Sequence, residues 1–305
     1  MKHNIKTYAL LLSITIWIAS PFGGRGAYAQ QLYTPFPSSF KNTRANELLE
    51  PQALAPFFQK IHENRRVKVM LIGDSHTRGN YYPRAVESQL KTYFSSLDFA
   101  YYGINGAWAR RFYEADMINK VANEHPDLVI ISFGTNEAHG ANIDQTAHHQ
   151  TLNTLTERIK ARCKGVTFLF TTPPGSFISK TTGSYTTGRG RRRRTHYTTT
   201  KTRNERTETV ARSIVNYCHT NHYAVWDIYT IAGGPTHACI NWRDAGLMNY
   251  DQIHYTAPGY QLQGRLLADA IHKAYTSVHA QGSQTALYHE GTPREQKPYK
   301  SLDGF

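Results

Sequence analysis

The feature that most constrains the fold is a regular alternation between short apolar runs and longer segments with helical spacing. Five apolar runs bounded by turn-forming residues read as strands, at residues 67–72, 97–102, 128–133, 166–171 and 223–228. Segments with apolar side chains every three or four residues read as helices, at residues 82–94, 111–124, 144–163, 205–221 and 258–278. Strands that alternate with helices favour a parallel sheet covered on both faces. We therefore expect an α/β fold with a central parallel sheet of about five strands.

The first 29 residues have the layout of a secretory signal peptide. Lys2 and Lys6 precede an apolar segment at residues 8–19, and small residues ending in Ala27-Tyr28-Ala29 follow it. This segment is shorter than the ~20 apolar residues of a membrane-spanning helix. We expect residues 1–29 to be removed, and the protein to be exported, either periplasmic or secreted, without a membrane span.

The rest of the chain suits a single α/β domain, which we place at residues 30–280. Residues 176–203 are rich in Thr, Gly and Arg and have no apolar period, so we expect a basic insertion loop there. Residues 281–305 offer little apolar surface to bury, and we expect a mobile C-terminal tail.

Positive charge is concentrated near the insertion. The whole chain has a formal net charge of +13, and residues 189–212 alone hold nine Lys or Arg against two Glu. An exported protein meets little nucleic acid, so we expect no nucleic-acid partner. If the run Arg191–Arg194 binds anything, anionic glycan or a membrane surface is favoured over other partners. A solvated loop is the alternative, and the sequence does not decide between them or indicate an oligomeric state.

The cysteines and histidines give no sign of a metal site. In an oxidising compartment, Cys163, Cys218 and Cys239 allow at most one intrachain disulfide, and their spacing does not choose the pair. His139 and the pair at 148–149 have no carboxylate or cysteine partner at a ligand spacing. We expect neither a metal nor another cofactor.

Polar clusters containing glycine follow three of the predicted strands, and a fourth precedes the last predicted helix. Their sequences are GDSH at 73–76, YYGINGAW at 101–108, FGTNEAHG at 133–140 and YDQIHYTAPGY at 250–260. The carboxyl ends of parallel strands meet at one edge of a sheet, where helix N-termini and ligands also gather. The four clusters therefore predict a single site.

These clusters supply the residue types for acyl transfer from an ester. A serine hydroxyl needs a base within hydrogen-bond reach, and Ser75 with His254 would provide this pair. Asp251, three residues before the histidine, would orient the imidazole. The backbone N–H groups of Ser75 and Gly106 and the side-chain amide of Asn136 are candidate donors to the oxyanion.

In these four blocks the chain resembles the SGNH, or GDSL-type, hydrolases. The blocks GDSH, NGA, GTNE and DQIH match that family's blocks in order. The resemblance implies a three-layer, flavodoxin-like fold, a Ser-His-Asp mechanism without a metal, and esterase or lipase activity. It assigns catalytic roles to Ser75, Gly106, Asn136, Asp251 and His254.

Two departures from the common pattern narrow the resemblance. His76 replaces the usual leucine, and the third block reads GTNEA instead of GxND. Together with the ending DxxHYTxxGY, these variants resemble bacterial peptidoglycan O-acetylesterases, which remove acetyl groups from the 6-hydroxyl of N-acetylmuramic acid. The expected substrate is therefore an acetylated glycan, with peptidoglycan first.

Several alternatives remain open at this point. Ser75 could be only an N-cap, Asn136 only a turn former, and Glu137 a backbone ligand. Trp108 and Tyr255 could stack on a sugar or pack in the core. At the level of function, the alternatives are an acetylesterase for acetylxylan, host glycans or sialic acids, a lipase or lysophospholipase, and a non-catalytic glycan-binding module in which the arginine run makes the contact.

Overall fold

The computed structural model describes residues 33–140 and 143–290, with side chains described as far as residue 280. The chain divides into two units, residues 1–33 and 34–305, and the architecture below is that of the second. The expected signal peptide at 1–29 and the last part of the expected tail, residues 291–305, lie outside the described residues.

A five-stranded parallel sheet forms the centre of this unit, which confirms the expected fold class. Its strand order is β2-β1-β3-β4-β7. The strands are β1 (Val67–Gly73), β2 (Leu97–Gly103), β3 (Leu128–Ser132), β4 (Thr167–Thr171) and β7 (Ala224–Trp226). Each coincides with one of the apolar runs, because a strand buried on both faces needs apolar side chains at nearly every position.

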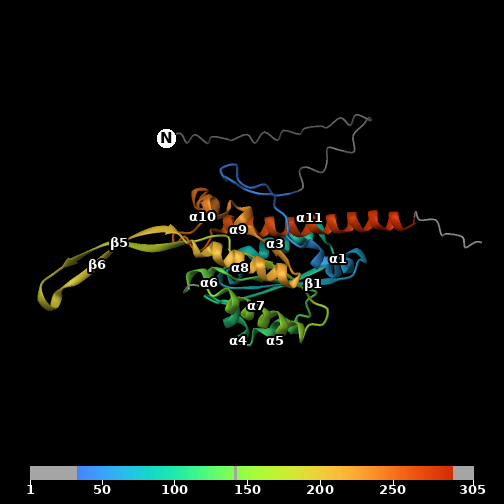
Figure 1. The fold of residues 1–305 in the computed structure, drawn as a ribbon, viewed down its shortest axis with the longest axis horizontal. Coiled ribbons are helices and arrows are strands. Elements are labelled where there is room, and N and C mark those ends of the chain that lie inside the picture. Colours follow the sequence, from blue (N-terminus) through green and yellow to red (C-terminus); the bar gives the residue numbers. More distant parts are fainter. Residues whose placement is uncertain (1–32, 141–142, 291–305) are drawn as a thin grey trace, which may run out of the picture. The chain divides into compact units, whose positions relative to one another are not determined.

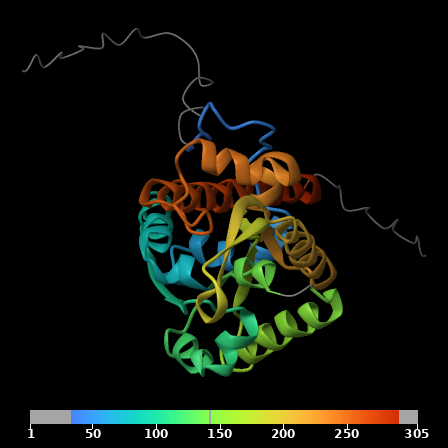
Figure 2. The same ribbon diagram turned by 90° about the vertical axis from the view of Figure 1, so that its left-hand side faces the viewer.

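Helices cover both faces of the sheet, and Figure 2 shows these layers from the side. One face carries η1 (Pro51–Leu54), α1 (Ala55–His62), α3 (Tyr81–Tyr93) and α11 (Ala257–Glu290). The other carries α4 (Ala109–Glu114), α5 (Met117–Asn123), α7 (Gln145–Lys160) and α8 (Arg206–Asn221). Successive strand side chains point to opposite faces, so Val69 and Leu71 join the first core while Met70 and Ile72 join the second.

Short helices lie at the ends of the strands. They are α2 (Ser75–Arg78) after β1, α6 (Thr135–His139) after β3, and α9 (Ile228–Ile231) and α10 (Gly234–Asp244) after β7. The last strand, β7, is only three residues long, so the end of the run at 223–228 has already turned into α9.

The segment at 176–203 is not an irregular loop, as the sequence suggested, but an antiparallel hairpin. Its strands are β5 (Phe177–Thr187) and β6 (Arg194–Arg203), joined by a turn that contains η2 (Gly190–Arg192). Figure 1 shows it extending away from the helices. Both its faces are exposed beyond Ile178, so the strands need no apolar alternation, and their many threonines favour extended backbone.

The last helix is longer than its apolar pattern. The sequence places its end near residue 278, whereas α11 continues to Glu290 and takes in the first ten residues of the expected tail. Its apolar stripe marks only the part that packs on the sheet. Helical backbone can continue past that stripe without burying a face, and periodicity does not report this continuation.

The thiols of Cys163, Cys218 and Cys239, which all lie in the described part, are buried and unbonded to one another. Among the described helices, none has the length and apolar character that crossing a membrane requires.

Helices α11 and α3 approach most closely at Gly264. A Cβ atom at this position would lie 2.6 Å from Cβ of Ala85 and 2.8 Å from the carbonyl oxygen of Tyr82. Real Cβ atoms do not come this close, so only glycine allows the observed approach. The contact matters for the site because α11 begins three residues after His254 and α3 begins three residues after α2.

We predict that Gly264→Ala lowers the free energy of unfolding by about 1–3 kcal/mol, since the added methyl group forces the two helices apart in spite of alanine's higher helix propensity. Denaturant unfolding would measure this change. Gly183→Ala is the matched control, because a Cβ there meets nothing within 4 Å. A Gly264→Ala variant as stable as the wild type would show that the helices do not pack as described.

Candidate active site

The four predicted polar clusters come together in one open pocket of about 750 Å³. Its lining includes Ser75, Gly106, Asn136 and His254, one residue from each cluster. The strand order explains why they meet. Because β1 lies between β2 and β3, the loops after these neighbouring strands open at the same edge, where the direction of chain progression reverses.

Ser75, His254 and Asp251 form a continuous chain of hydrogen bonds. The Oγ atom of Ser75 lies 2.9 Å from Nε2 of His254, and Nδ1 of His254 lies 2.6 Å from Oδ2 of Asp251. An ionised carboxylate can only accept, so Nδ1 carries the proton and Nε2 accepts from the serine hydroxyl. This is the tautomer that a general base for serine requires.

A tight turn holds Asp251 beneath the imidazole. Its Oδ1 accepts from the backbone N–H groups of Ile253 and His254, both at 2.9 Å, which leaves Oδ2 for the ring. Burial alone would raise the pKa of Asp251, but the hydrogen bonds from the ring and the two N–H groups outweigh it and lower the pKa below its usual value. The carboxyl group is therefore ionised when it faces the imidazole.

The glycine before the acid-serine pair has a steric cause. A Cβ on Gly73 would lie 2.6 Å from the carbonyl oxygen of Ser132 on β3 and would collide with the side chain of Thr77 on α2. Only glycine lets α2 start directly against the end of the sheet. This packing fixes Ser75 as the first residue of α2, where its N–H has no acceptor within the helix.

The remaining candidate oxyanion donors lie beside the serine, although Asn136 is already engaged. Gly106 lines the same pocket and has a left-handed φ of +65°. The Nδ2 atom of Asn136 donates to Oδ2 of Asp74 at 3.0 Å and to the carbonyl oxygen of Ala107 at 2.9 Å. Both amide hydrogens thus have acceptors, so donation to an oxyanion requires one of them to be shared or released.

Two buried carboxyl groups support these loops. Asp74 accepts from the backbone N–H of His76 as well as from Asn136, and burial, partly opposed by the His76 bond, raises its pKa to about 8. Glu137 accepts from the N–H groups of Gly134 at 3.0 Å and Ala109 at 3.1 Å, and burial raises its pKa to about 7. Glu137 therefore binds backbone and ties the loop after β3 to the start of α4.

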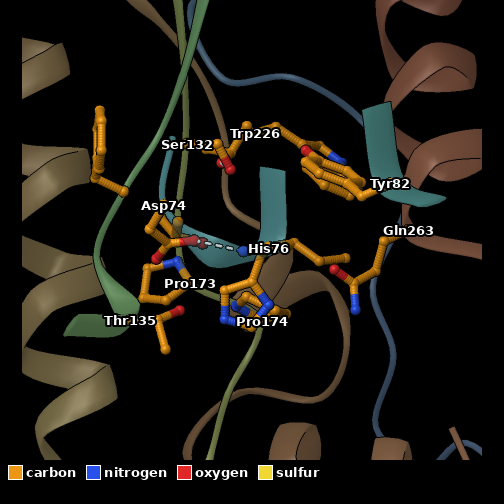
Figure 3. A pocket seen from close by; sticks show the side chains of 13 residues that line it. Asp74, His76, Tyr82, Ser132, Thr135, Pro173, Pro174, Trp226 and Gln263 are labelled. Carbon is orange, nitrogen blue, oxygen red and sulfur yellow. Dashed lines mark hydrogen bonds between the residues drawn. The ribbon is translucent and has the colours of Figure 1, made fainter. Parts of the chain in front are cut away.

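Behind the serine lies a small cavity of about 20 Å³, whose lining side chains are drawn in Figure 3. The ring of His76 is buried there, 5.1 Å from the ring of His254, and its Nδ1 shares a 2.8 Å hydrogen bond with the hydroxyl of Tyr260. Within the described part, Nε2 of His76 and Nε2 of Gln263 have no protein partner, and the volume suits one water. Burial, followed by the nearby charge of His254, lowers the pKa of His76 to about 3.

Sequence reasoning missed Tyr260 and Gln263 as supports of His76. Their spacing of three residues places them on the same side of α11, which was the only available signal. Their partner lies 184 residues away from Tyr260, so the contact itself was not visible.

The structure separates the two aromatic candidates. Tyr255 is only 1% exposed, and its hydroxyl donates to the carbonyl oxygen of Gly175 at 2.6 Å, so it packs in the core beside the pocket. Trp108 is 48% exposed and lines a neighbouring hollow of about 580 Å³. Of the two, Trp108 alone offers a face to a ligand.

The other histidines are held by serine residues. Nε2 of His139 lies 2.9 Å from Oγ of Ser176, and Nδ1 of His148 lies 2.8 Å from Oγ of Ser213. His149 contacts the carbonyl oxygen of the same Ser213. No group of three potential metal ligands occurs in the part of the chain that the structure describes.

A parallel α/β sheet with a serine, a histidine and an aspartate in sequence at its carboxyl edge is an arrangement used by serine ester hydrolases. The model of the GDSL-like lipase/acylhydrolase family matches residues 71–262, and this chain belongs to that family. It is accordingly a hydrolase of the esterase and acylhydrolase type. The sequence matches none of the curated proteins with which it was compared.

Solved structures share the fold at low sequence identity. A peptidoglycan O-acetylesterase superposes with a TM-score of 0.63 and 17% identity, covering 75% of this chain and 99% of that one. A lipase/acylhydrolase from Enterococcus faecalis has a TM-score of 0.47 and 19% identity, covering 68% and 96%. A putative lipolytic protein of the G-D-S-L family from Desulfitobacterium hafniense has 0.48 and 17%, covering 67% and 99%.

We predict that Ser75→Ala and His254→Ala each lower kcat on an aryl acetate by several orders of magnitude, roughly 10³- to 10⁶-fold, because either change removes the activated nucleophile. Ser95→Ala, which alters an exposed serine at the opposite edge of the sheet, should leave the rate unchanged. Wild-type turnover in either of the first two variants would remove the hydrogen-bonded chain from the mechanism.

For Asn136→Ala we predict a fall in kcat of about 10²- to 10³-fold with little change in KM, the scale for losing one oxyanion donor. Steady-state kinetics on the same ester would measure it, and Asn119→Ala on the exposed side of α5 is the control. A kcat within threefold of wild type would assign the Asn136 amide to loop support alone.

Proposed function

We propose that the protein is an exported serine carbohydrate esterase that removes O-acetyl groups, with the 6-O-acetyl group of N-acetylmuramic acid in peptidoglycan as its leading substrate. The observation that carries this proposal is the hydrogen-bonded chain from Ser75 through His254 to Asp251, open to a pocket at the carboxyl edge of the sheet.

In this mechanism the Oγ atom of Ser75 attacks the acetyl carbonyl carbon while His254 takes the hydroxyl proton. Asp251 stabilises the imidazolium. The tetrahedral oxyanion is held by the N–H groups of Ser75 and Gly106, with Asn136 as a third donor. His254 then protonates the departing sugar oxygen, which leaves acetyl-serine. Water, deprotonated by the same histidine, attacks this ester and releases acetate.

Three observations support an acetylated glycan over other esters. The motif variants at His76, GTNEA and DxxHYTxxGY are those of peptidoglycan O-acetylesterases. A solved structure with the same fold is an enzyme of that activity. The pocket is open and shares its rim with the exposed face of Trp108, an arrangement that suits a polymer with a small acyl group.

The test is acetate release from a substrate panel by wild type and Ser75→Ala. The panel contains O-acetylated peptidoglycan, acetylxylan, O-acetylated sialic acid, an aryl acetate and a long-chain acyl ester. We expect release from peptidoglycan with the highest kcat/KM and none in the variant. Preference for another acetylated glycan would reassign the substrate, and preference for the long chain would indicate a lipase. Glycan binding without any hydrolysis would indicate a binding module.

A further inference from the structure

The hairpin β5–β6, residues 177–203, is called the basic arm below. From Ser179 to Thr200 its residues are exposed, and the two strands pair along their length with one bulge near Gly183. With ten residues in β6 and a rise of about 3.3 Å per residue, the arm reaches ~30 Å from its root. A hairpin of this length without a core is an uncommon element to carry unless it contacts something.

The arm is rooted on the turn that holds the catalytic candidates. The N–H of Phe177 donates to the carbonyl oxygen of Gln252 at 2.9 Å, and Nζ of Lys201 donates to the carbonyl oxygen of Asp251 at 2.9 Å. Ser176, just before the arm, contacts His139, which lines the pocket. A molecule lying along the arm is therefore led to the rim of the pocket.

The side chains of the arm define the chemistry of what it can hold. Between residues 177 and 203 there is no Asp or Glu, and there are eight Lys or Arg, four of them consecutive at Arg191–Arg194. Most other side chains carry hydroxyls. Tyr185 and Tyr197 are 59% and 68% exposed and, being paired with neighbouring positions of the opposite strand, lie on opposite faces. Guanidinium groups bind carboxylates, hydroxyls bond sugars, and tyrosine rings pack on them.

These features favour a carboxylate-bearing glycan over a membrane or a protein strand. Membrane-binding segments place Trp, Phe or Leu beside their basic residues, whereas the tip of the arm reads GRGRRR. Strand addition by another protein is disfavoured by the bulge and by the mutual repulsion of a positively charged edge.

We propose that the basic arm binds the anionic glycan strand that carries the acetyl esters and holds it along the approach to Ser75. This inference rests on the proposed function, since it names the same polymer, and it adds a second binding surface outside the pocket. Charge attracts the polymer at the arm, while the pocket selects the acetyl group.

The central test compares Arg191→Gln/Arg192→Gln/Arg193→Gln with a matched triple variant, Lys120→Gln/Arg162→Gln/Lys164→Gln, which removes three exposed cations elsewhere. On O-acetylated peptidoglycan we expect the arm variant to raise KM about tenfold with kcat unchanged, and the matched variant to behave as wild type. On an aryl acetate and on a neutral acetylated glucomannan both variants should equal wild type.

Salt gives a second readout. Raising NaCl from 50 to 500 mM should increase the wild-type KM for peptidoglycan and leave that of the arm variant nearly constant, because exposed charges are screened at high ionic strength. A wild-type KM for peptidoglycan retained by the arm variant would overturn the proposal, as would an equal loss on the neutral polymer.

Cosedimentation of the Ser75→Ala protein with de-O-acetylated peptidoglycan separates this proposal from the function. Arginine-dependent sedimentation is expected. If wild type releases no acetate yet sediments in this way, the arm proposal stands and the esterase proposal fails. Arginine-dependent binding to vesicles of anionic phospholipid, without binding to peptidoglycan, would overturn the arm proposal in favour of a membrane surface.

Discussion

The whole site depends on one hydrogen bond between residues 179 positions apart in sequence, from the hydroxyl of Ser75 to Nε2 of His254. Neither residue is placed by its own neighbours alone. Ser75 is fixed because Gly73 lets α2 press against the end of β3, and His254 is fixed because the turn before α11 closes on Asp251. The bond therefore reports how well α11 packs against α3, with Gly264 at their contact.

A second link between the same two segments lies behind the first. His76, next to the nucleophile, shares a hydrogen bond with Tyr260 on the first turn of α11. Because burial keeps this imidazole neutral, it adds no positive charge beside His254. The departure from leucine at position 76 thus has a structural reading: it replaces an apolar contact with a directed bond between the serine turn and the helix after the catalytic histidine.

Sequence reasoning reached the strands and the clustering of the polar loops, because apolar runs bounded by turns and the parallel topology place Ser75 and His254 at one edge. It failed where solvent or distance decides. The arm has no apolar period since both faces meet water, and its threonines looked like a loop. The bonds of Asn136 to Asp74 and Ala107, and the burial of Tyr255, depend on side-chain packing between distant segments, which no local spacing encodes.

The turn at residues 251–254 serves two structures through different atoms. Its backbone carbonyl oxygens, at Asp251 and Gln252, accept from the root of the basic arm, whereas the Asp251 carboxylate is reserved for the N–H groups and ring of the turn itself. The root is further anchored by Phe177, which is buried and has the guanidinium of Arg243 5.0 Å from its ring centre. An exposed two-stranded hairpin is marginal by itself. Anchoring it through the carbonyl oxygens stabilises the arm without using the acceptor on which the imidazole depends.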